Sequence, residues 1–521
     1  TEAEVTSQPT TQATTQTTTE TTSQTTTETY ERYQDLYFYS VNDFHGGSYL
    51  DFSSFSNIIG KIDDMRETET NVIALANGDI LQGTAISNYY QGKPLMDAMN
   101  YGNFDGFVIG NHEFDWGIEK IAEYADGNQE NGEANFPFLA SNIVVTATQE
   151  KLPWTQDYVI VENNGYRVGI IGAMGYGLES SIEASRIAGY SFLDPVPIAA
   201  SLSEELRLNQ DCDVVVLAIH GYSEDTNWAV ASLEGNQRID AILGAHTHQQ
   251  ISPTYQRSDD YNIPALQARA NNISVATLEL YMEDAKAVAG DVRFYFPENY
   301  TKDSDILAVI ANYQDDIDTS NEVIAYTPEF LSRARLGSEM TNAMAEAFDT
   351  DVAIMNTGGV RSTIEAGNIA YKHIYEVFPF DNTVVLLDLT GQDLQDLVDE
   401  NYGYLYFNDA FNHHNINLSA TYKIAVVDYV YTNQYYEEYF EDGTNLEYTD
   451  ILIRDVFIDY LLQEDELTTL VVGVNPFSEE FMMHIGSSSA KQYTDDLLYG
   501  YNIVAQTPEG VLLFDVNTVL K

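Results

Sequence analysis

Short apolar runs bounded by glycine and polar residues recur along the chain from Asp35 onward. Between them lie longer stretches whose apolar residues recur at helical spacing, as in residues 53–66 and 195–208. Strands that alternate with helices predict an α/β domain built in layers. The runs that we expect to form its buried strands are residues 36–41, 72–76, 107–109, 168–171, 214–219 and 241–243.

A second α/β unit is predicted from about residue 326 onward. Before it, residues 303–322 place apolar side chains at helical spacing behind an acidic start, which predicts one connecting helix. The second unit is expected to contain a helix over 339–348, strands over 352–355 and 383–389, and an amphipathic helix over 448–463. The remainder of the chain has strand-like pieces and no motif that indicates a function.

The composition predicts a folded and strongly acidic protein. The chain has 521 residues, 44% of them hydrophobic and 20% charged, which suffices for about three domains, or for two domains with extensions, and for a substantial core. Lys and Arg total 23 against 81 Asp and Glu, so the formal net charge is −58. This charge excludes an extended surface for nucleic acid or anionic lipid, because both are held mainly by cationic side chains. A phosphate ligand therefore requires a local positive site, supplied by metal ions or by a few arginines.

Three further features bear on the compartment. The single cysteine, Cys212, excludes intrachain disulfides and thiolate metal clusters. No apolar run reaches the ~20 residues of a transmembrane helix, so we expect no membrane span. Thr supplies 15 of the first 29 residues, which predicts a disordered spacer over residues 1–34. Such a spacer suits an extracellular protein, secreted or anchored to the cell surface through it. A linker without further function, or a salt-adapted cytoplasmic protein, is the alternative.

Five segments share one pattern, in which a predicted strand ends, Gly or Asn lies close by, and a side chain that can bind a metal follows. Open α/β sheets bind ligands at the carboxyl ends of their strands, so we expect these side chains to converge on one crevice. Two of the segments carry their metal-binding side chains two residues apart, which puts both on one side of an extended backbone. The segments are VNDFHGG with Asp43 and His45, NGDILQG with Asp79, IGNHEFDWG with Asn111, His112 and Asp115, AIHGY with His220, and GAHTHQQ with His246 and His248.

The candidate ligand set contains one Asn, two Asp and four His, and no thiolate. Imidazole and carboxylate ligands suit divalent ions such as Zn, Mn, Fe or Ni. Seven side chains are too many for one tetrahedral ion, so two divalent ions bridged by Asp79 are the economical prediction. Two ions about 3.5–4 Å apart can clamp an in-line displacement at phosphorus and activate a water molecule. They also supply the positive charge that a phosphate requires in so acidic a chain.

At these motifs the sequence resembles the 5′-nucleotidase family of two-domain calcineurin-like metallophosphoesterases. The resemblance covers about residues 35–460 and rests on D-x-H, G-D-x-x-x-G, G-N-H-E-F-D-x-G, a lone His-Gly and G-H-T-H. It implies one metal held by Asp43, His45, Asp79 and His248, and a second held by Asp79, Asn111, His220 and His246. It implies likewise that His112 and Asp115 are the catalytic pair.

The residues themselves give the catalytic pair a physical rationale. His112 follows a candidate ligand, where an imidazolium stabilises charge that develops on the phosphoryl group or the leaving oxygen. Asp115, three residues later, is placed to orient the ring and to raise its pKa. The alternative is a purely structural histidine.

The second unit carries candidate substrate contacts in MNTGGVRS, with Asn356, Gly358, Gly359 and Arg361, and in VFPFDNTV, with Phe380. A Gly-Gly turn lets the backbone approach a ligand closely, and Arg361 offers a planar guanidinium to phosphate or ribose. In the family that the sequence resembles, the matching Asn and Arg contact ribose and phosphate, and the matching Phe stacks on the base. The second stacking aromatic of the family would fall at Tyr429. The alternative is that both aromatics belong to the core.

The sequence departs from the family pattern at two places. The family usually follows its second aromatic with Gly-Gly-Asp-Gly, whose Asp helps to recognise the nucleoside, whereas VYTNQYYEEYF follows Tyr429 here. The family's Arg before the first helix of the second domain is not cleanly matched. Arg333 and Arg335 lie nearby, and we take Arg335 as the candidate substitute. Both departures leave the phosphatase chemistry intact and leave the nucleoside specificity open.

The resemblance implies an α/β protein with a four-layer α/β/β/α metallophosphoesterase domain and a smaller α/β nucleotidase domain. We accordingly expect a catalytic domain over residues 35–300, a linker helix over 301–325, a substrate-binding domain over 326–470 and an extension of unknown role over 471–521.

The leading prediction is a secreted or surface-tethered phosphohydrolase that releases phosphate from nucleoside 5′-monophosphates by in-line attack of metal-activated water. Its partner is then a small nucleotide rather than a nucleic acid polymer. Alternatives on the same scaffold are a 2′,3′-cyclic-nucleotide phosphodiesterase/3′-nucleotidase and a nucleotide-sugar hydrolase. A surface binding module with a degenerate core is the alternative from another class, and the complete ligand set argues against it.

Overall fold

The structure is a computed structural model, and it describes most of the chain between residues 35 and 463. The described ranges are 35–47, 54–128, 131–163, 165–269, 275–283, 285–296 and 299–463, with three short strands at 481–483, 503–506 and 512–514. The predicted spacer over residues 1–34 and most of the predicted extension over 471–521 lie outside the described residues.

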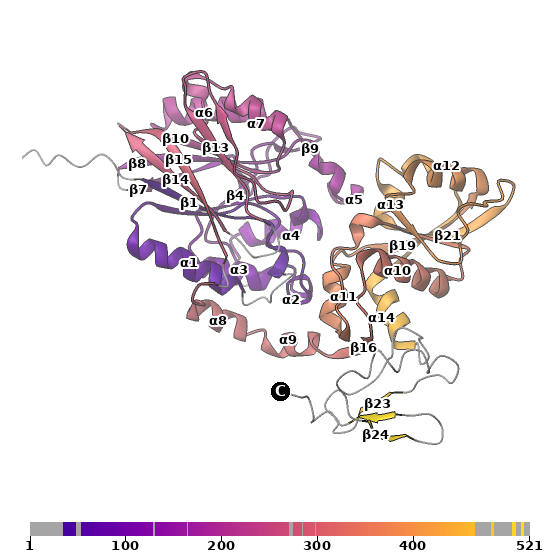
Figure 1. The fold of residues 1–521 in the computed structure, drawn as a ribbon. Helices are drawn as coiled ribbons and strands as arrows, with labels where there is room; N and C mark the ends of the chain where they lie inside the picture. Colours follow the sequence, from indigo (N-terminus) through magenta and orange to yellow (C-terminus); the bar gives the residue numbers. More distant parts are fainter. Residues whose placement is uncertain are drawn as a thin grey trace, which may run out of the picture.

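Two facing sheets form the centre of the first domain (Figure 1). The first sheet has the order β15 (Lys286–Tyr295), β14 (Val275–Glu283), β1 (Leu36–Val41), β2 (Val72–Ala76), β3 (Gly106–Val108), β4 (Phe138–Leu139) and β6 (Thr155–Gln156). The second has the order β12 (Thr254–Gln256), β13 (Asn262–Leu266), β11 (Ala241–Leu243), β10 (Val214–His220), β8 (Tyr166–Met174) and β7 (Tyr158–Asn163).

Helices cover the outer face of each sheet. The first sheet packs against α1 (Ser54–Thr68) and α3 (Lys93–Tyr101), and the second packs against α6 (Pro195–Asn209). In β1, Phe38 belongs to the apolar core between the sheets, whereas Tyr39 belongs to the core beneath the helices. Strands that are covered on both faces need apolar residues at nearly every position, which is why they read as continuous apolar runs. The predicted α/β/β/α layering is confirmed.

The second domain is built on one five-stranded sheet of mixed direction. Its order is β20 (Leu405–Phe407), β17 (Val352–Asn356), β21 (Thr421–Val427), β19 (Thr383–Thr390) and β22 (Thr444–Leu452). The helices that share its apolar core are α10 (Arg333–Phe348), α11 (Tyr371–Val377), α12 (Gly391–Asn401), α13 (Asp428–Thr432) and α14 (Ile453–Gln463).

The single connecting helix that was expected over residues 303–322 is wrong in detail. The segment forms two helices, α8 (Ser304–Ala311) and α9 (Gln314–Ser320), which run beneath the first domain towards the second (Figure 1). The break falls at Asn312 and Tyr313. The Tyr313 hydroxyl donates to Asp97 Oδ2 on α3 at 2.7 Å, and its ring packs edge-on against Tyr90. These contacts fix Tyr313 against the first domain.

The amphipathic helix that was expected over residues 448–463 is only half correct. Residues up to Leu452 extend β22 along β19, with Val385 opposite Tyr448, and α14 begins at Ile453. The hydrogen-bond ladder of the sheet therefore overrides a local pattern that also fits a helix. The helix that was expected over 339–348 begins earlier, at Arg333, because the Ser332 hydroxyl accepts from the Arg335 amide at 3.2 Å and caps it.

Gly172 in β8 marks a close approach of the two sheets, and its replacement tests their packing. A Cβ atom at Gly172 would clash with the Cβ atom of Leu139 in β4. We expect Gly172→Ala to lower the free energy of unfolding by about 1–3 kcal/mol, because overpacking forces the sheets apart. Urea denaturation measures this. Gly189→Ala is the control, since a Cβ atom there would have no neighbour within 4 Å among the described residues. Equal stability of the two variants would contradict the packing described.

Candidate metal centre

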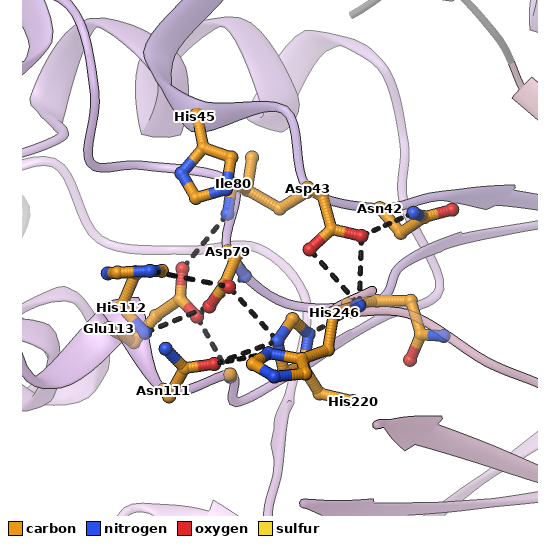
Figure 2. A network of polar contacts seen from close by, with 12 residues as sticks. Asn42, Asp43, His45, Asp79, Ile80, Asn111, His112, Glu113, His220 and His246 are labelled. Atoms are coloured by element: carbon orange, nitrogen blue, oxygen red, sulfur yellow. Dashed lines mark hydrogen bonds and ion pairs between the residues drawn. The ribbon is translucent and has the colours of Figure 1, made fainter. Parts of the chain in front are cut away.

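The predicted ligands come together where five strands end (Figure 2). They follow the carboxyl ends of β1, β2, β3 and β11, and His220 is itself the last residue of β10. The two sheets pack face to face, so the loops beyond their strand ends meet over one edge of the core. The residues involved are Asp43, His45, Asp79, Asn111, His112, Asp115, His220, His246 and His248.

The backbone at these residues is not extended, contrary to the expectation for the two pairs spaced two residues apart. Asp43, His45, His246 and His248 have φ angles of 50°, 47°, 80° and 62°. These values lie in the left-handed region that non-glycine residues seldom adopt, and such strain is concentrated at functional sites. Asp43 and His45 belong to one group of potential metal ligands, whereas His246 and His248 belong to two different groups.

The first group consists of Asp43, His45 and His248, whose ligand atoms lie within 4.8 Å of one another. His45 Nε2 is 3.2 Å from His248 Nε2, and His248 Nε2 is 3.7 Å from Asp43 Oδ1. His45 Nδ1 lies 3.3 Å from the carbonyl oxygen of Gln82, which accepts its proton. The lone pair of His45 Nε2 therefore points into the group, where a cation would accept it.

The second group consists of Asp79, His220 and His246. His220 Nε2 lies 3.0 Å from Asp79 Oδ2, and its Nδ1 donates to the carbonyl oxygen of Asn77 at 2.8 Å. Asn111 Oδ1 faces both rings, 3.2 Å from His220 Nε2 and 3.0 Å from His246 Nδ1. Asp79 lies between the two groups and also meets His45 and His112.

These side chains fit a divalent cation. Within the described part of the chain, the buried Asp79 Oδ2 has an ion pair with His220 Nε2 at 3.0 Å and no further hydrogen-bond partner, and a carboxylate buried in this way is destabilised unless a positive charge accompanies it. His45 Nε2 and His248 Nε2 face each other at 3.2 Å, and since His45 Nδ1 carries the proton of its ring, His248 Nε2 donates to His45 Nε2; a shared cation would take the place of that proton. Imidazole nitrogens with carboxylate and amide oxygens are the ligands of borderline and hard divalent ions.

Electrostatics keep most of the imidazoles ready to bind a cation. Burial lowers the pKa of His246 to about 4 and that of His248 to about 3, so both rings are neutral at pH 7. Burial raises the pKa of Asp43 to about 6. Burial also lowers the pKa of His220, but the adjacent Asp79 carboxylate outweighs it and raises that pKa to about 10. The positive charge of protonated His220 thus compensates the Asp79 carboxylate, as a bound cation would.

His112 and Asp115 lie against the same centre. His112 Nδ1 is 2.9 Å from Asp115 Oδ2, and its Nε2 is 4.0 Å from Asp79 Oδ2. Burial lowers the pKa of His112, but the carboxylates of Asp115 and Asp79 outweigh it and raise the pKa above its ordinary value. The ring stacks on Phe380 of the second domain, with centroids 5.4 Å apart and planes 16° apart. The imidazole is therefore held at one nitrogen and on one face.

A cavity of about 760 Å³ lies over the centre, between the two domains. The first domain contributes the metal-binding side chains, and the second contributes most of the predicted substrate contacts. The predicted residues along its wall are Asp79, Asn111, His112, Asp115, His246, His248, Asn356, Gly358, Arg361, Phe380 and Tyr429.

Two predicted substrate contacts do not reach this wall. Gly359 is buried behind Gly358, where a Cβ atom would meet Met355 Cε and the Asn356 side chain. Arg335 lies on α10 and is paired with Glu339, away from the cavity.

Sequence reasoning missed Glu113, whose role is visible only in the folded chain. Its buried carboxylate accepts from the backbone amides of Asp79, Ile80 and Gly110 at 2.9, 3.1 and 2.8 Å (Figure 2). It thereby clamps the loop that carries Asp79 to the loop that carries Asn111. The one available signal was the place of Glu113 inside the GNHEFDWG motif, directly after His112.

Residues 178–187 of the first domain were missed as well. This segment, with η5 (Leu178–Ser181) and α5 (Ala184–Ile187), reaches across to the second domain (Figure 1). Ser181, Glu183 and Arg186 line the cavity, and Glu183 accepts from the Thr432 hydroxyl at 3.1 Å. No motif singles out these residues.

The clamp formed by Glu113 can be tested by Glu113→Gln. The amide replaces one acceptor oxygen by an NH₂ group that faces backbone donors, so we expect the free energy of unfolding to fall by about 1–3 kcal/mol. Urea denaturation of both proteins measures the change. In the control, Glu123→Gln, only the exposed pair with Lys120 is lost, and we expect less than about 0.5 kcal/mol. Similar losses for both variants would refute the clamp.

Comparisons with known proteins identify the family of both domains. Residues 36–250 match the calcineurin-like phosphoesterase model, and residues 309–426 match the model of the 5′-nucleotidase C-terminal domain. A 5′-nucleotidase of Vibrio parahaemolyticus is 26% identical over 390 residues, which cover 64% of this chain and 68% of that protein. The cell wall protein Lmo0130 of Listeria monocytogenes is 24% identical over 500 residues, covering 81% of this chain and 61% of that protein.

A solved structure supports the fold. The 5′-nucleotidase precursor from Thermus thermophilus superposes with a TM-score of 0.69 at 22% identity, over 85% of this chain and 98% of that one. The two matched models succeed one another along the chain in the order of the two observed domains. The chain therefore belongs to the two-domain 5′-nucleotidase family of calcineurin-like phosphoesterases, which are metal-dependent hydrolases.

Proposed function

We propose that this chain is a two-metal phosphohydrolase that releases phosphate from nucleoside 5′-monophosphates outside the cell. One observation carries the proposal above all: a single cavity holds metal-binding side chains on one wall and a guanidinium with two aromatic rings on the other. A nucleotide has the matching ends, a dianionic phosphate and a flat base. The clusters of Asp43, His45 and His248 and of Asp79, His220 and His246 support two ions.

The first-domain residues would act on the phosphate end. Two divalent cations, when bound by these clusters, supply positive charge and lower the pKa of a water molecule near the phosphorus. Asp79 lies where it would serve both ions, because it shares its surroundings with ligands of each. Asn111 adds an amide oxygen to the second cluster without adding negative charge.

His112 would handle the charge and the proton of the leaving group. The carboxylates of Asp115 and Asp79 favour its protonated form, so the ring offers a proton from Nε2 while Nδ1 stays bound to Asp115. A protonated imidazole at the leaving oxygen turns an alkoxide into a neutral hydroxyl as the ester bond breaks, which leaves the nucleoside and inorganic phosphate.

The second domain would hold the nucleoside. Arg361 lies with its guanidinium carbon 5.8 Å from the centroid of the Phe380 ring, and Tyr429 lines the same cavity. Aromatic faces stack on any base, so these residues support nucleoside binding without choosing the base. Asp428 also lines the cavity, but its carboxylate already accepts from Asn382, Thr383 and the Tyr429 amide.

Because the Asp428 carboxylate already accepts several hydrogen bonds, it is not free to bind a ribose, and this favours a second candidate function on the same scaffold. The other carboxylate that the described part of the second domain brings to the cavity, Asp381, is paired with Arg454. The Gly-Gly-Asp-Gly segment is absent from the sequence after Tyr429, so neither carboxylate is well placed to read the ribose hydroxyls. A looser nucleoside site would accept 3′-nucleotides, 2′,3′-cyclic nucleotides or nucleotide sugars. Rates on 3′-AMP, cyclic CMP and UDP-glucose, compared with the rate on AMP, distinguish these functions.

Two observations support the extracellular placement. One similar protein is named a cell wall protein, and the Thr-rich start of the sequence suits a spacer. Within the described part of the chain, no helix has both the length and the apolar character that a bilayer crossing requires.

Metal removal tests the proposed function directly. We expect the purified protein to hold two divalent ions per chain by elemental analysis, and to release phosphate from AMP faster than from 3′-AMP, cyclic CMP or UDP-glucose. Dialysis against a chelator should abolish release, and added Mn²⁺ or Zn²⁺ should restore it. Hydrolysis that continues in the presence of chelator would refute the two-metal proposal. Faster release from another ester would identify that ester, rather than AMP, as the preferred substrate.

Replacement of His112 tests its part in the reaction. We expect His112→Asn to lower kcat for AMP by about 10²–10⁴-fold, because a positioned acid contributes that much, while the metal content stays unchanged. Steady-state kinetics with elemental analysis of the same sample measures both. His414→Asn, in an exposed loop of the second domain, is the control. If His112→Asn had the kcat of the wild type, His112 would have only a structural role.

A further inference from the structure

The segment 378–381, which presents Phe380 to the cavity, directs its successive carbonyl groups to the two domains in turn. The carbonyl oxygens of Phe378 and Phe380 accept from Arg454 Nη1 at 3.1 and 2.7 Å, within the second domain. The carbonyl oxygen of Pro379, between them, faces the first domain instead. Three consecutive peptide groups are thus fixed from two sides.

Arg454 forms the second-domain half of this support. Its side chain is 4% exposed, its guanidinium carbon lies 4.5 Å from the centroid of the Tyr375 ring, and it is paired with Asp381. A buried guanidinium that is bound to two carbonyl oxygens and a carboxylate has little freedom to move. The backbone around Phe380 is therefore rigid relative to its own domain.

Gln82 and Asn88 form the first-domain half. Gln82 Nε2 and Asn88 Nδ2 both donate to the Pro379 carbonyl oxygen, at 2.9 and 2.8 Å, across 297 and 291 residues of sequence. Both side chains are buried. Asn88 Oδ1 accepts from the Gly83 amide at 2.9 Å, so the orientation of its amide group is fixed by a second contact.

The same Gln82 also touches the metal centre. Its own carbonyl oxygen accepts from His45 Nδ1, so one residue supports a metal-binding ring with its backbone and the second domain with its side chain. Immediately beyond the Pro379 contact, the Phe380 ring stacks on His112. The contact at Pro379 is therefore placed to set the distance between the metal centre and Phe380.

We propose that Gln82 and Asn88 are positioning residues. They dock the second domain through the Pro379 carbonyl and so hold the Phe380 ring in its stacked position beside His112. Neither residue touches the reacting atoms. The buried carbonyl is satisfied only while the domains are together, so separation would leave it and both amides to be hydrated. The consequence for catalysis rests on the proposed nucleotide hydrolysis, whereas the docking itself does not.

Gln82→Met separates these roles, since Met matches Gln in length, lacks the donor and leaves the backbone contact to His45 in place. We expect kcat/KM for AMP to fall about tenfold, mainly through a higher KM, because one buried hydrogen bond and the position of Phe380 are lost. We expect kcat for glycerol phosphate, which has no ring to stack, to change less than about twofold. Equal losses for both substrates would overturn the proposal, because the metal centre would then be damaged.

A second readout does not depend on activity. Small-angle X-ray scattering should give Gln82→Met a larger radius of gyration than the wild type, at equal thermal stability. Gln392→Met is the matched control, since Gln392 lies on the exposed face of α12 and donates to Asp396 of the same helix. Asn88→Asp, which keeps the acceptor for the Gly83 amide, is the second variant if Gln82→Met does not fold.

The outcomes distinguish the two proposals. Unchanged scattering and unchanged KM in both variants would refute the positioning role. If the wild type releases no phosphate from AMP, the proposed function fails, and the scattering comparison still decides whether Gln82 and Asn88 dock the domains.

Discussion

The attraction between the buried Asp79 carboxylate and the positive charge around it is the interaction on which the site depends. Asp79 is 1% exposed, its Oδ2 atom lies 3.0 Å from His220 Nε2, and the rings of His220, His112 and His45 surround it. A charge removed from water in this way must be compensated, by protons or by cations. The compensating charge is also what lets a chain with a net charge of −58 attract a phosphate.

The fold supplies the rigidity that this concentration of charge requires. Two sheets that pack through an apolar core fix the strand ends, and the loops beyond them are held by single buried polar residues. Glu113 ties the Asp79 loop to the Asn111 loop, and Asn42 binds Asp43 Oδ2 at 2.6 Å while also bonding Ala268. Strained φ angles at the ligands persist because these neighbours determine the local backbone.

Much of the architecture could be predicted because it is encoded locally. Strands 36–41, 72–76 and 241–243 agree with β1, β2 and β11 at both ends, since strands that are buried on both faces are apolar throughout. Local pattern failed where long-range contacts compete with it. The β22 ladder replaced the start of an expected helix, and Tyr313, fixed against α3, divided another.

The sequence by itself determined which ligand chemistry is present and that it follows strand ends, because residue type and apolar pattern are properties of short segments. Only the tertiary structure decided the left-handed turns at Asp43 and His246, the place of Arg335 away from the cavity, and the contact of Gln82 with Pro379. Those outcomes arise between segments as far as 297 residues apart. They are set by how two apolar cores pack and meet, which the order of residues within any one segment does not specify.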